Sequence, residues 1–181
     1  MQITRNQIRV GMPVNGSLDG FNTIGIDLRD GNPSTNIGQN TIFDITNHTG
    51  TNVDVAGIIV SGATTTNVDV HNNFIRNVVS SRRQTTLGNP ANYGLIARNA
   101  SSLRLNHNTV ALLTPNSAGP SVANAVSSAF LVTSTLQEFN NNIMVNVNGS
   151  TNALCLITNN AAITNTTMDK NCFFAPNGGI A

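Results

Sequence analysis

Two carboxylates and an arginine occupy equivalent places in this sequence, because Asp69, Arg104 and Glu138 each lie four residues before an asparagine. Two carboxyl groups about 5–10 Å apart can share the acid and base steps of glycosidic-bond cleavage. If the strands that carry them stack about 4.8 Å apart, Asp69 and Glu138 lie roughly 10 Å apart with Arg104 between them. A neighbouring guanidinium lowers the pKa of a carboxyl group and so disfavours the protonated form that a general acid needs. An exposed charge ladder, worth about 0.2–1 kcal/mol per pair, is therefore the favoured interpretation.

Other side chains that could do chemistry are more scattered. Asp27, Arg29 and Arg98 fall on outward positions of a different predicted strand. Calcium takes 6–8 oxygen ligands, usually from several carboxylates, so one aspartate does not make a site. The three histidines, at 48, 71 and 107, fall at unlike positions, and no zinc or other metal site is predicted.

A candidate ligand loop lies next to this strand. Arg82 and Arg83 belong to the longest connecting segment, which also contains Tyr93, the only tyrosine. They could bind a sugar, although a solvated pair of loop charges is the favoured interpretation.

A repeat positions these residues. Marker asparagines recur at steps of 34, 33, 35, 34 and 29 residues, which is typical of stacked repeats. The markers are Asn6, Asn40, Asn73, Asn108, Asn142 and Asn171. Each is expected at a corner that requires left-handed backbone geometry, where asparagine is favoured, and its amide is expected to bond to the next marker in a ladder.

Apolar residues divide each repeat into three short strands. The second strand is expected to bury the residue three before the marker, and the third the residue two after it. The first carries apolar residues two apart, such as Ile26 and Leu28. No segment has a helical period. The chain is therefore predicted to be an all-β parallel β-helix, a solenoid of about five coils with three strands and roughly 34 residues each.

One domain, residues 1–181, is expected, as a fragment of a longer solenoid. Residues 1–23 are predicted to form a partial coil without its first and second strands, and residues 175–181 a cut end. Ile59, Ile96, Leu131 and Cys155 are expected to form an apolar stripe outside the first strand. Such a stripe is either covered by loops or serves self-association. End-to-end association is the other form of self-association expected.

Composition excludes some partners. A formal net charge of +1 gives no electrostatic basis for binding nucleic acid, and no apolar run is long enough for membrane insertion. Residues 1–5 contain no apolar stretch, so no signal peptide is expected within this chain. Cys155 and Cys172 are expected to be free thiols.

The sequence resembles the right-handed parallel β-helix repeats of pectate-lyase-like proteins, of the secreted bacterial or phage type. The resemblance rests on the family pattern NxxVxxNxFxN, which 67–77 follows with Ile75 at the phenylalanine position, and on its variant at 139–146. It implies a right-handed solenoid, secretion or display on a cell surface, and carbohydrate as the ligand class. Lyases of this family use acidic calcium ligands with an arginine or lysine base. Asp27, Arg29 and Arg98 would then be the catalytic candidates, with calcium as cofactor.

Two functions follow from these expectations. The first is a non-catalytic extracellular scaffold or binding module, with a glycan as ligand and no cofactor. The alternative is a carbohydrate-active enzyme, a polysaccharide lyase or glycoside hydrolase, acting on the first strand and its adjacent loops.

Overall fold

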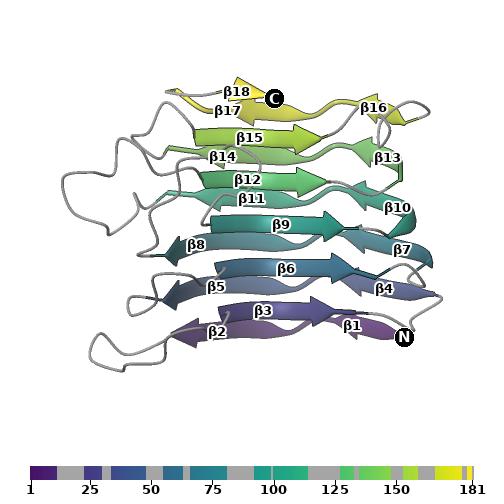
Figure 1. Ribbon diagram of the computed structural model, residues 1–181, viewed down its shortest axis with the longest axis horizontal. Coiled ribbons are helices and arrows are strands. Elements are labelled where there is room, and N and C mark those ends of the chain that lie inside the picture. The colour runs from purple at the N-terminus through teal and green to yellow at the C-terminus, as the bar shows by residue number, and fades with distance from the viewer. Residues whose placement is uncertain are drawn as a thin grey trace.

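The computed structural model describes residues 1–11, 23–29, 34–47, 55–62, 66–80, 92–98, 100–113, 127–132, 135–147, 153–158, 166–176 and 179–180. Within these ranges the chain is all-β, with no helix, and its strands form three parallel six-stranded sheets. Figure 1 shows the strands stacked in order from β1, β2 and β3 at one end to β16, β17 and β18 at the other.

Every third strand belongs to the same sheet. Sheet A comprises β1 (Gln2–Thr4), β4 (Thr35–Gly38), β7 (Thr66–His71), β10 (Ser101–Asn106), β13 (Leu136–Asn140) and β16 (Thr167–Asp169). Sheet B comprises β2 (Gln7–Gly11), β5 (Thr41–Asn47), β8 (Phe74–Ser80), β11 (Thr109–Leu112), β14 (Ile143–Asn146) and β17 (Cys172–Phe174). Sheet C comprises β3 (Thr23–Leu28), β6 (Val55–Ser61), β9 (Asn92–Arg98), β12 (Ser127–Val132), β15 (Ala153–Thr158) and β18 (Gly179–Ile180).

The chain therefore visits sheets C, A and B in turn, and we call one such set of three strands a repeat. Each strand pairs with the strand of the same sheet in the next repeat. Ile37, for example, lies opposite Val70, and Ile42 opposite Ile75. The predicted parallel, all-β repeat is confirmed at this level, and the arrangement is compatible with a β-helix.

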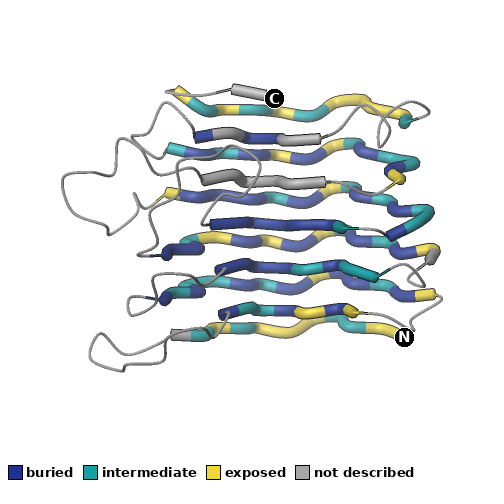
Figure 2. The backbone as a smooth tube through the Cα atoms, viewed as in Figure 1, coloured by how far each residue is buried: buried dark blue, intermediate teal, exposed yellow. Residues whose placement is uncertain are grey.

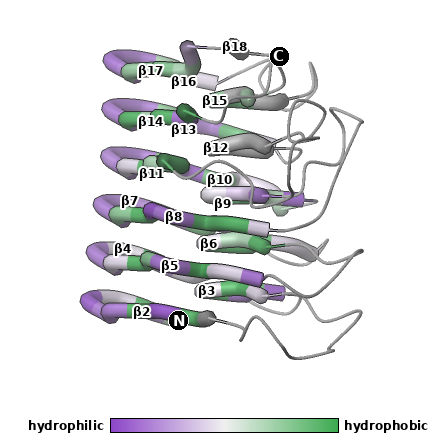
Figure 3. The backbone as a smooth tube through the Cα atoms, turned by 90° about the vertical axis from the view of Figure 1, so that its left-hand side faces the viewer, coloured by the Kyte–Doolittle hydropathy of each residue, from purple (hydrophilic) through white to green (hydrophobic). Residues whose placement is uncertain are grey.

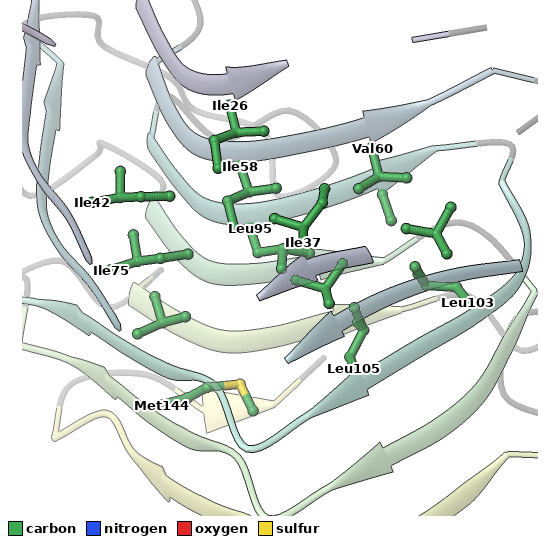
Figure 4. Close-up of a cluster of buried hydrophobic side chains, with 14 of the residues drawn as sticks. Ile26, Ile37, Ile42, Ile58, Val60, Ile75, Leu95, Leu103, Leu105 and Met144 are labelled. Carbon is green, nitrogen blue, oxygen red and sulfur yellow. The ribbon is translucent and has the colours of Figure 1, made fainter. Parts of the chain in front are cut away.

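The predicted inward columns form the core between the sheets (Figure 4). In sheet A the fully buried members are Ile37, Val70, Leu105 and Phe139, and in sheet B they are Ile42, Ile75, Val110 and Met144. Figure 2 shows that burial is greatest in the middle repeats, whereas the last strands are largely exposed. At the ends of the columns Ile8 and Phe173 are only half-buried and Met168 is 44% exposed. The core is thus continuous along the stack and open at both ends.

Glycines let sheets B and C approach each other. Gly25 and Gly57 are opposite one another in sheet C, and an added Cβ at Gly57 would lie 2.5 Å from Cγ2 of Ile75 and 2.6 Å from the carbonyl oxygen of Gly94. At Gly25 it would lie 2.7 Å from Cγ2 of Ile42. The isoleucines of sheet B therefore fill the space that side chains at these positions would occupy.

The corner between sheets A and B differs from the prediction by one residue. The positive-φ residue is the one before each marker asparagine, and the markers themselves are not left-handed. The six corner residues are Arg5 (60°), Gln39 (59°), Asn72 (52°), His107 (59°), Asn141 (56°) and Lys170 (53°). Only two of them are asparagine. The markers are therefore selected by their side-chain hydrogen bonds, not by their backbone.

Strands at both ends differ from expectation. The prediction that the first coil lacks its second strand is wrong, because β1 pairs with β4 in sheet A. Near the other end, within the segment expected to be a cut end, β18 pairs with β15.

Cys155 is another correction. It was assigned to the outer apolar stripe, but register pairs Leu131 with Ile157 and places Cys155 in the core, 1% exposed. The register predicted for β15 against the preceding strand of sheet C is therefore wrong by two residues. Both cysteines are free thiols, as predicted, with Cys172 exposed.

Candidate functional site

The marker asparagines form a buried hydrogen-bond ladder along the corner between sheets A and B. Nδ2 of each marker donates to Oδ1 of the next: Asn6 to Asn40 (3.0 Å), Asn40 to Asn73 (2.9 Å), Asn73 to Asn108 (3.0 Å), Asn108 to Asn142 (3.2 Å) and Asn142 to Asn171 (3.0 Å). All donors point towards the C-terminal repeat. The predicted amide ladder is confirmed.

Each inner marker is fully satisfied. Oδ1 of Asn108 accepts from both the backbone N–H (3.2 Å) and Nδ2 (3.0 Å) of Asn73. Its Nδ2 also donates to the carbonyl oxygen of Val70 at 2.8 Å. Since a buried amide without partners is costly, the four bonds explain why asparagine recurs here.

Beside this ladder, the outer surface of sheet A carries two columns of polar side chains, which we call the polar face. One column contains Asn36, Asp69, Arg104 and Glu138, in register from repeat to repeat. The other contains His71, Asn106, Asn140 and Asp169. Figure 3 shows hydrophilic residues at the corner between sheets A and B in successive repeats.

Polar contacts link most members of the polar face across repeats. Nδ2 of Asn106 donates to Oε2 of Glu138 at 2.9 Å, and Oδ1 of Asn106 accepts from the backbone N–H of Asn140 at 3.1 Å. Nε of Arg104 lies 3.4 Å from Oε1 of Glu138. Both side chains of this ion pair are about two-fifths exposed, so it adds little stability.

The His71 side chain contacts the preceding repeat. Its Nε2 is 2.9 Å from Oδ1 of Asn36, and its Nδ1 is 3.1 Å from Nδ2 of Asn72. The ring occupies the space above Gly38, where an added Cβ would lie 2.7 Å from Nε2. With Asn36 Oδ1 as an acceptor and Asn72 Nδ2 as a donor, these contacts match the tautomer that carries its proton on Nε2.

Asp69 differs from its neighbours. It lies between Asn36 and Arg104 in the column, half-buried, and among the described residues its carboxylate has neither a hydrogen bond nor an ion pair. The register predicted for Asp69, Arg104 and Glu138 is confirmed, but only the Arg104–Glu138 contact forms. The carboxylate of Asp69 therefore keeps its acceptor sites free for a ligand.

The candidates on sheet C are far from forming one centre. The two carboxylate oxygens of Asp27 accept hydrogen bonds from Nε of Arg29, two residues along the chain, at 3.0 and 2.8 Å. The hydrogen bond that Arg29 donates to Asp27, and then the negative charge of Asp27, raises the pKa of Arg29. Arg98 lies two repeats further along, because Asp27 pairs with Ile59 and Ile59 with Ile96.

The apolar stripe and the tyrosine on sheet C are covered. Tyr93 and Ile96 are 0% and 1% exposed, and with Ala56 they form a second apolar cluster against which the half-buried Ile59 packs. The guanidinium of Arg98 lies over the Tyr93 ring, 5.6 Å from its centroid. For these residues the structure favours the alternative in which the stripe is covered. The buried side chains of Tyr93 and Ile96 are not accessible to a ligand. Arg82 and Arg83 lie outside the described residues, as does the side chain of Leu131.

Sequence reasoning missed the amide and imidazole members of the polar face. His71, Asn106 and Asn140 all lie two residues before a marker, and Asn36 lies four before one. The spacing that aligned Asp69 with Glu138 also aligns these positions, so the signal was present but was applied to charged residues alone.

No constellation of ligands emerges elsewhere in the described residues, where no group of three or more His, Cys, Asp or Glu side chains is placed to hold a metal ion. The same ranges contain no helix long and apolar enough to cross a membrane. Comparison with known proteins finds no matching family model, no matching curated protein and no matching solved structure.

Proposed function

We propose that this chain is a right-handed parallel β-helix solenoid that acts as a non-catalytic extracellular or cell-surface scaffold and binds a glycan on its polar face. Three parallel sheets visited in a constant order, with constant register between repeats, support the solenoid. The right-handed form, the extracellular location and the ligand class rest on the resemblance to pectate-lyase-like repeats.

The engagement of two of the three candidate catalytic carboxylates, Asp27 and Glu138, supports a scaffold. Both oxygens of Asp27 accept from Arg29. Both oxygens of Glu138 are engaged, one with Arg104 and the other with Asn106. A general acid, a nucleophile or a calcium ligand needs a carboxylate oxygen that is free to meet substrate or metal.

Asp69 carries the proposal that the polar face binds a ligand. Its carboxylate has no partner among the described residues, yet an amide acceptor and donor at Asn36 and a guanidinium at Arg104 flank it in register. A carboxylate, an amide and a guanidinium offer acceptors and donors to adjacent hydroxyl groups of one sugar ring. Because a polysaccharide repeats along its length, columns that repeat from strand to strand can contact successive sugars.

An exposed apolar side chain begins the strand that follows the corner. Phe74 directly follows the marker Asn73, begins β8 and is 40% exposed. Ligand sites combine aromatic surface with a few placed polar groups, and a sugar ring has both an apolar face and a hydroxyl rim. We therefore expect Phe74 to contact the apolar face of a sugar whose hydroxyls reach Asp69.

The test is a binding titration of the purified protein against a panel of neutral and acidic polysaccharides, by affinity electrophoresis and calorimetry. Asp69→Ala is expected to weaken binding about tenfold or more, because a charged hydrogen-bond partner is worth about 1.5–3 kcal/mol. Asp27→Ala is the matched control, since it removes a carboxylate on another sheet, and it should leave affinity unchanged. Equal affinity in wild type and Asp69→Ala, or no binding to any glycan, would refute the polar-face proposal.

The enzyme alternative is tested with the same panel. The polysaccharides are incubated with folded protein with and without calcium, and new reducing ends and unsaturated ends are measured. Product formation that is lost in Asp27→Ala, Arg29→Ala or Arg98→Ala would replace the scaffold by a lyase. Product formation lost in Asp69→Ala or Glu138→Ala would replace it by a hydrolase.

A further inference from the structure

The charged groups of the polar face are unevenly paired. Three of its members are carboxylates, namely Asp69, Glu138 and Asp169. Nε of Arg104, its one arginine, lies 3.4 Å from Oε1 of Glu138, and Nζ of Lys170 at the adjoining corner lies 3.3 Å from Oδ2 of Asp169. In the described chain Asp69 alone of the three carboxylates has no cation within ion-pair distance. The excess negative charge of this face is therefore centred on Asp69.

Asp69 belongs to an inner repeat, so both of its neighbours on the sheet are defined. β4 pairs with one edge of β7 and β10 with the other, which makes Asn36 and Arg104 the register partners of Asp69. The side chain of Asp69 is half-buried. A carboxylate in this position loses part of its hydration without gaining a counter-charge, so a cationic group of a ligand is attracted to it more strongly than to a fully solvated carboxylate.

Asn36 supplies a hydrogen-bond donor beside this carboxylate. Nε2 of His71 lies 2.9 Å from Oδ1 of Asn36, and in the tautomer with its proton on Nε2 the ring donates this bond. The amide oxygen of Asn36 is thereby occupied, whereas its Nδ2 has no partner within the described residues. Because adjacent strands are about 4.8 Å apart, the side chains of Asn36 and Asp69 start next to each other. A free N–H donor and a free carboxylate thus share one small area of the polar face.

Given the glycan-binding function proposed above, we infer that the glycan on the polar face carries free amino groups, as an amino sugar does, and that Asp69 selects it. The protonated amine of the sugar donates to the carboxylate of Asp69. The oxygen of the adjacent hydroxyl group accepts from Nδ2 of Asn36. An amine and a hydroxyl on neighbouring carbons of one ring match the acceptor and the donor that the two residues offer.

An acidic glycan fits the same area poorly. Its carboxylate would meet the negative charge of Asp69, while the nearest guanidinium, that of Arg104, is engaged with Glu138. A neutral glycan can donate hydroxyl groups to Asp69, but a neutral donor is bound less strongly by a carboxylate than an ammonium group is. The expected order of affinity is therefore amino glycan first, neutral glycan second and acidic glycan last.

Two matched oligosaccharides test this order on the full chain. One is a glucosamine oligomer with free amines, and the other is the same oligomer with every amine acetylated. Both are titrated by calorimetry at a pH below the pKa of the sugar amine. The free-amine oligomer should bind about tenfold more tightly at low ionic strength, because an ion pair is added to the hydroxyl contacts. The difference should shrink in high salt, since salt screens partly exposed charges.

Asp69→Asn is the decisive variant, because it keeps the shape of the side chain and removes its charge. This variant should bind the two oligomers with equal affinity. Asp27→Asn removes a carboxylate on sheet C and is the matched control, in which the preference for the free-amine oligomer should persist. Circular dichroism checks that both variants are folded. A preference that persists in Asp69→Asn overturns the assignment of selectivity to this residue.

The ion pair next to Asp69 allows a test in both directions. Arg104→Gln removes the neighbouring positive charge, so the affinity for the free-amine oligomer should rise about two- to fivefold. In Glu138→Gln the guanidinium of Arg104 loses its partner and can turn towards Asp69, so that affinity should fall by a similar factor. A purely structural role of the pair would not move the affinity in opposite directions, and equal effects of the two variants contradict the inference.

The outcomes distinguish the choice of an amino glycan from glycan binding itself. If the acetylated oligomer or an acidic oligosaccharide binds the wild-type chain as tightly as the free-amine oligomer, the amino-sugar inference is wrong and glycan binding stands. If a lysine oligomer of the same length binds as tightly as the glucosamine oligomer, the polar face recognises ammonium groups without a sugar, and the inference is wrong as well. If no oligosaccharide binds, both the inference and the proposed function fail.

Discussion

Removing one inner rung of the asparagine ladder should have a large effect on stability. In Asn108→Ala, the backbone N–H of Asn73 and one Nδ2 hydrogen of Asn73 lose their acceptor, and the carbonyl of Val70 loses its side-chain donor. Oδ1 of Asn142 also loses one of its two donors. Each buried polar group left unpaired costs about 1–3 kcal/mol. Three such groups give an expected loss of about 3–9 kcal/mol in the free energy of unfolding.

The matched control is the asparagine two residues earlier. Asn106 is half-buried on the polar face and makes two side-chain contacts, to Glu138 (2.9 Å) and from the backbone of Asn140 (3.1 Å). Water can replace both, so Asn106→Ala should cost about 0.5–1.5 kcal/mol. The two variants remove the same atoms from positions two residues apart, and they differ in burial and in the number of hydrogen bonds lost.

Urea unfolding followed by circular dichroism measures both. The midpoint is the primary observable, and the slope is compared between variants because repeat proteins can depart from two-state behaviour. Equal losses in Asn108→Ala and Asn106→Ala, or a loss under about 1 kcal/mol in Asn108→Ala, would refute the argument that ladder satisfaction stabilises the stack.

Other predictions concern the core, the thiols and sheet C. Gly57→Ala should lose about 1–3 kcal/mol in urea unfolding, because its methyl would overlap Cγ2 of Ile75; an unchanged midpoint would contradict the close approach. A thiol reagent should modify Cys172 in the folded protein and Cys155 only on unfolding, as measured by mass spectrometry; rapid labelling of both is the contrary result. Burial raises the pKa of the Cys155 thiol. The contribution of this thiol to stability is therefore complete below the ordinary thiol pKa, and it is lost as the pH rises through the pKa of the folded state. Cys155→Ala should remove that alkaline loss from a pH series of unfolding midpoints. Asp27→Asn should leave the urea midpoint essentially unchanged, since its partner is an exposed arginine two residues away; a clear loss would give the pair a structural role.

Much of the fold could be predicted because one period governs it. The marker spacing placed Ile37, Val70 and Leu105 in one inward column, and all three are fully buried in register. Charge positions relative to the markers gave the register of Arg104 and Glu138. These features depend only on counting from an asparagine.

The predictions that were wrong depend on backbone and side-chain geometry that residue spacing does not specify. Cys155 was predicted on the outer side because β15 was aligned by the apolar alternation of Leu154 and Leu156. A register shifted by two residues satisfies that alternation equally well. The left-handed corner was assigned to the marker because asparagine tolerates that conformation, yet Gln39 and Lys170 adopt it instead. The free carboxylate of Asp69 could not be predicted at all, because it depends on whether Arg104 turns towards Glu138.

The pairing of each strand with one a full repeat away has a consequence for folding. Strands that are neighbours in the sequence lie in different sheets, so no segment shorter than about one repeat can form a single ladder hydrogen bond. A first pair such as β5 and β8 must close a loop of roughly thirty residues before any of its bonds form, and that entropic cost slows nucleation. Each later repeat adds to an edge that already exists. The chain should therefore fold by one slow nucleation event followed by growth in both directions, and its end repeats should exchange amide hydrogens fastest.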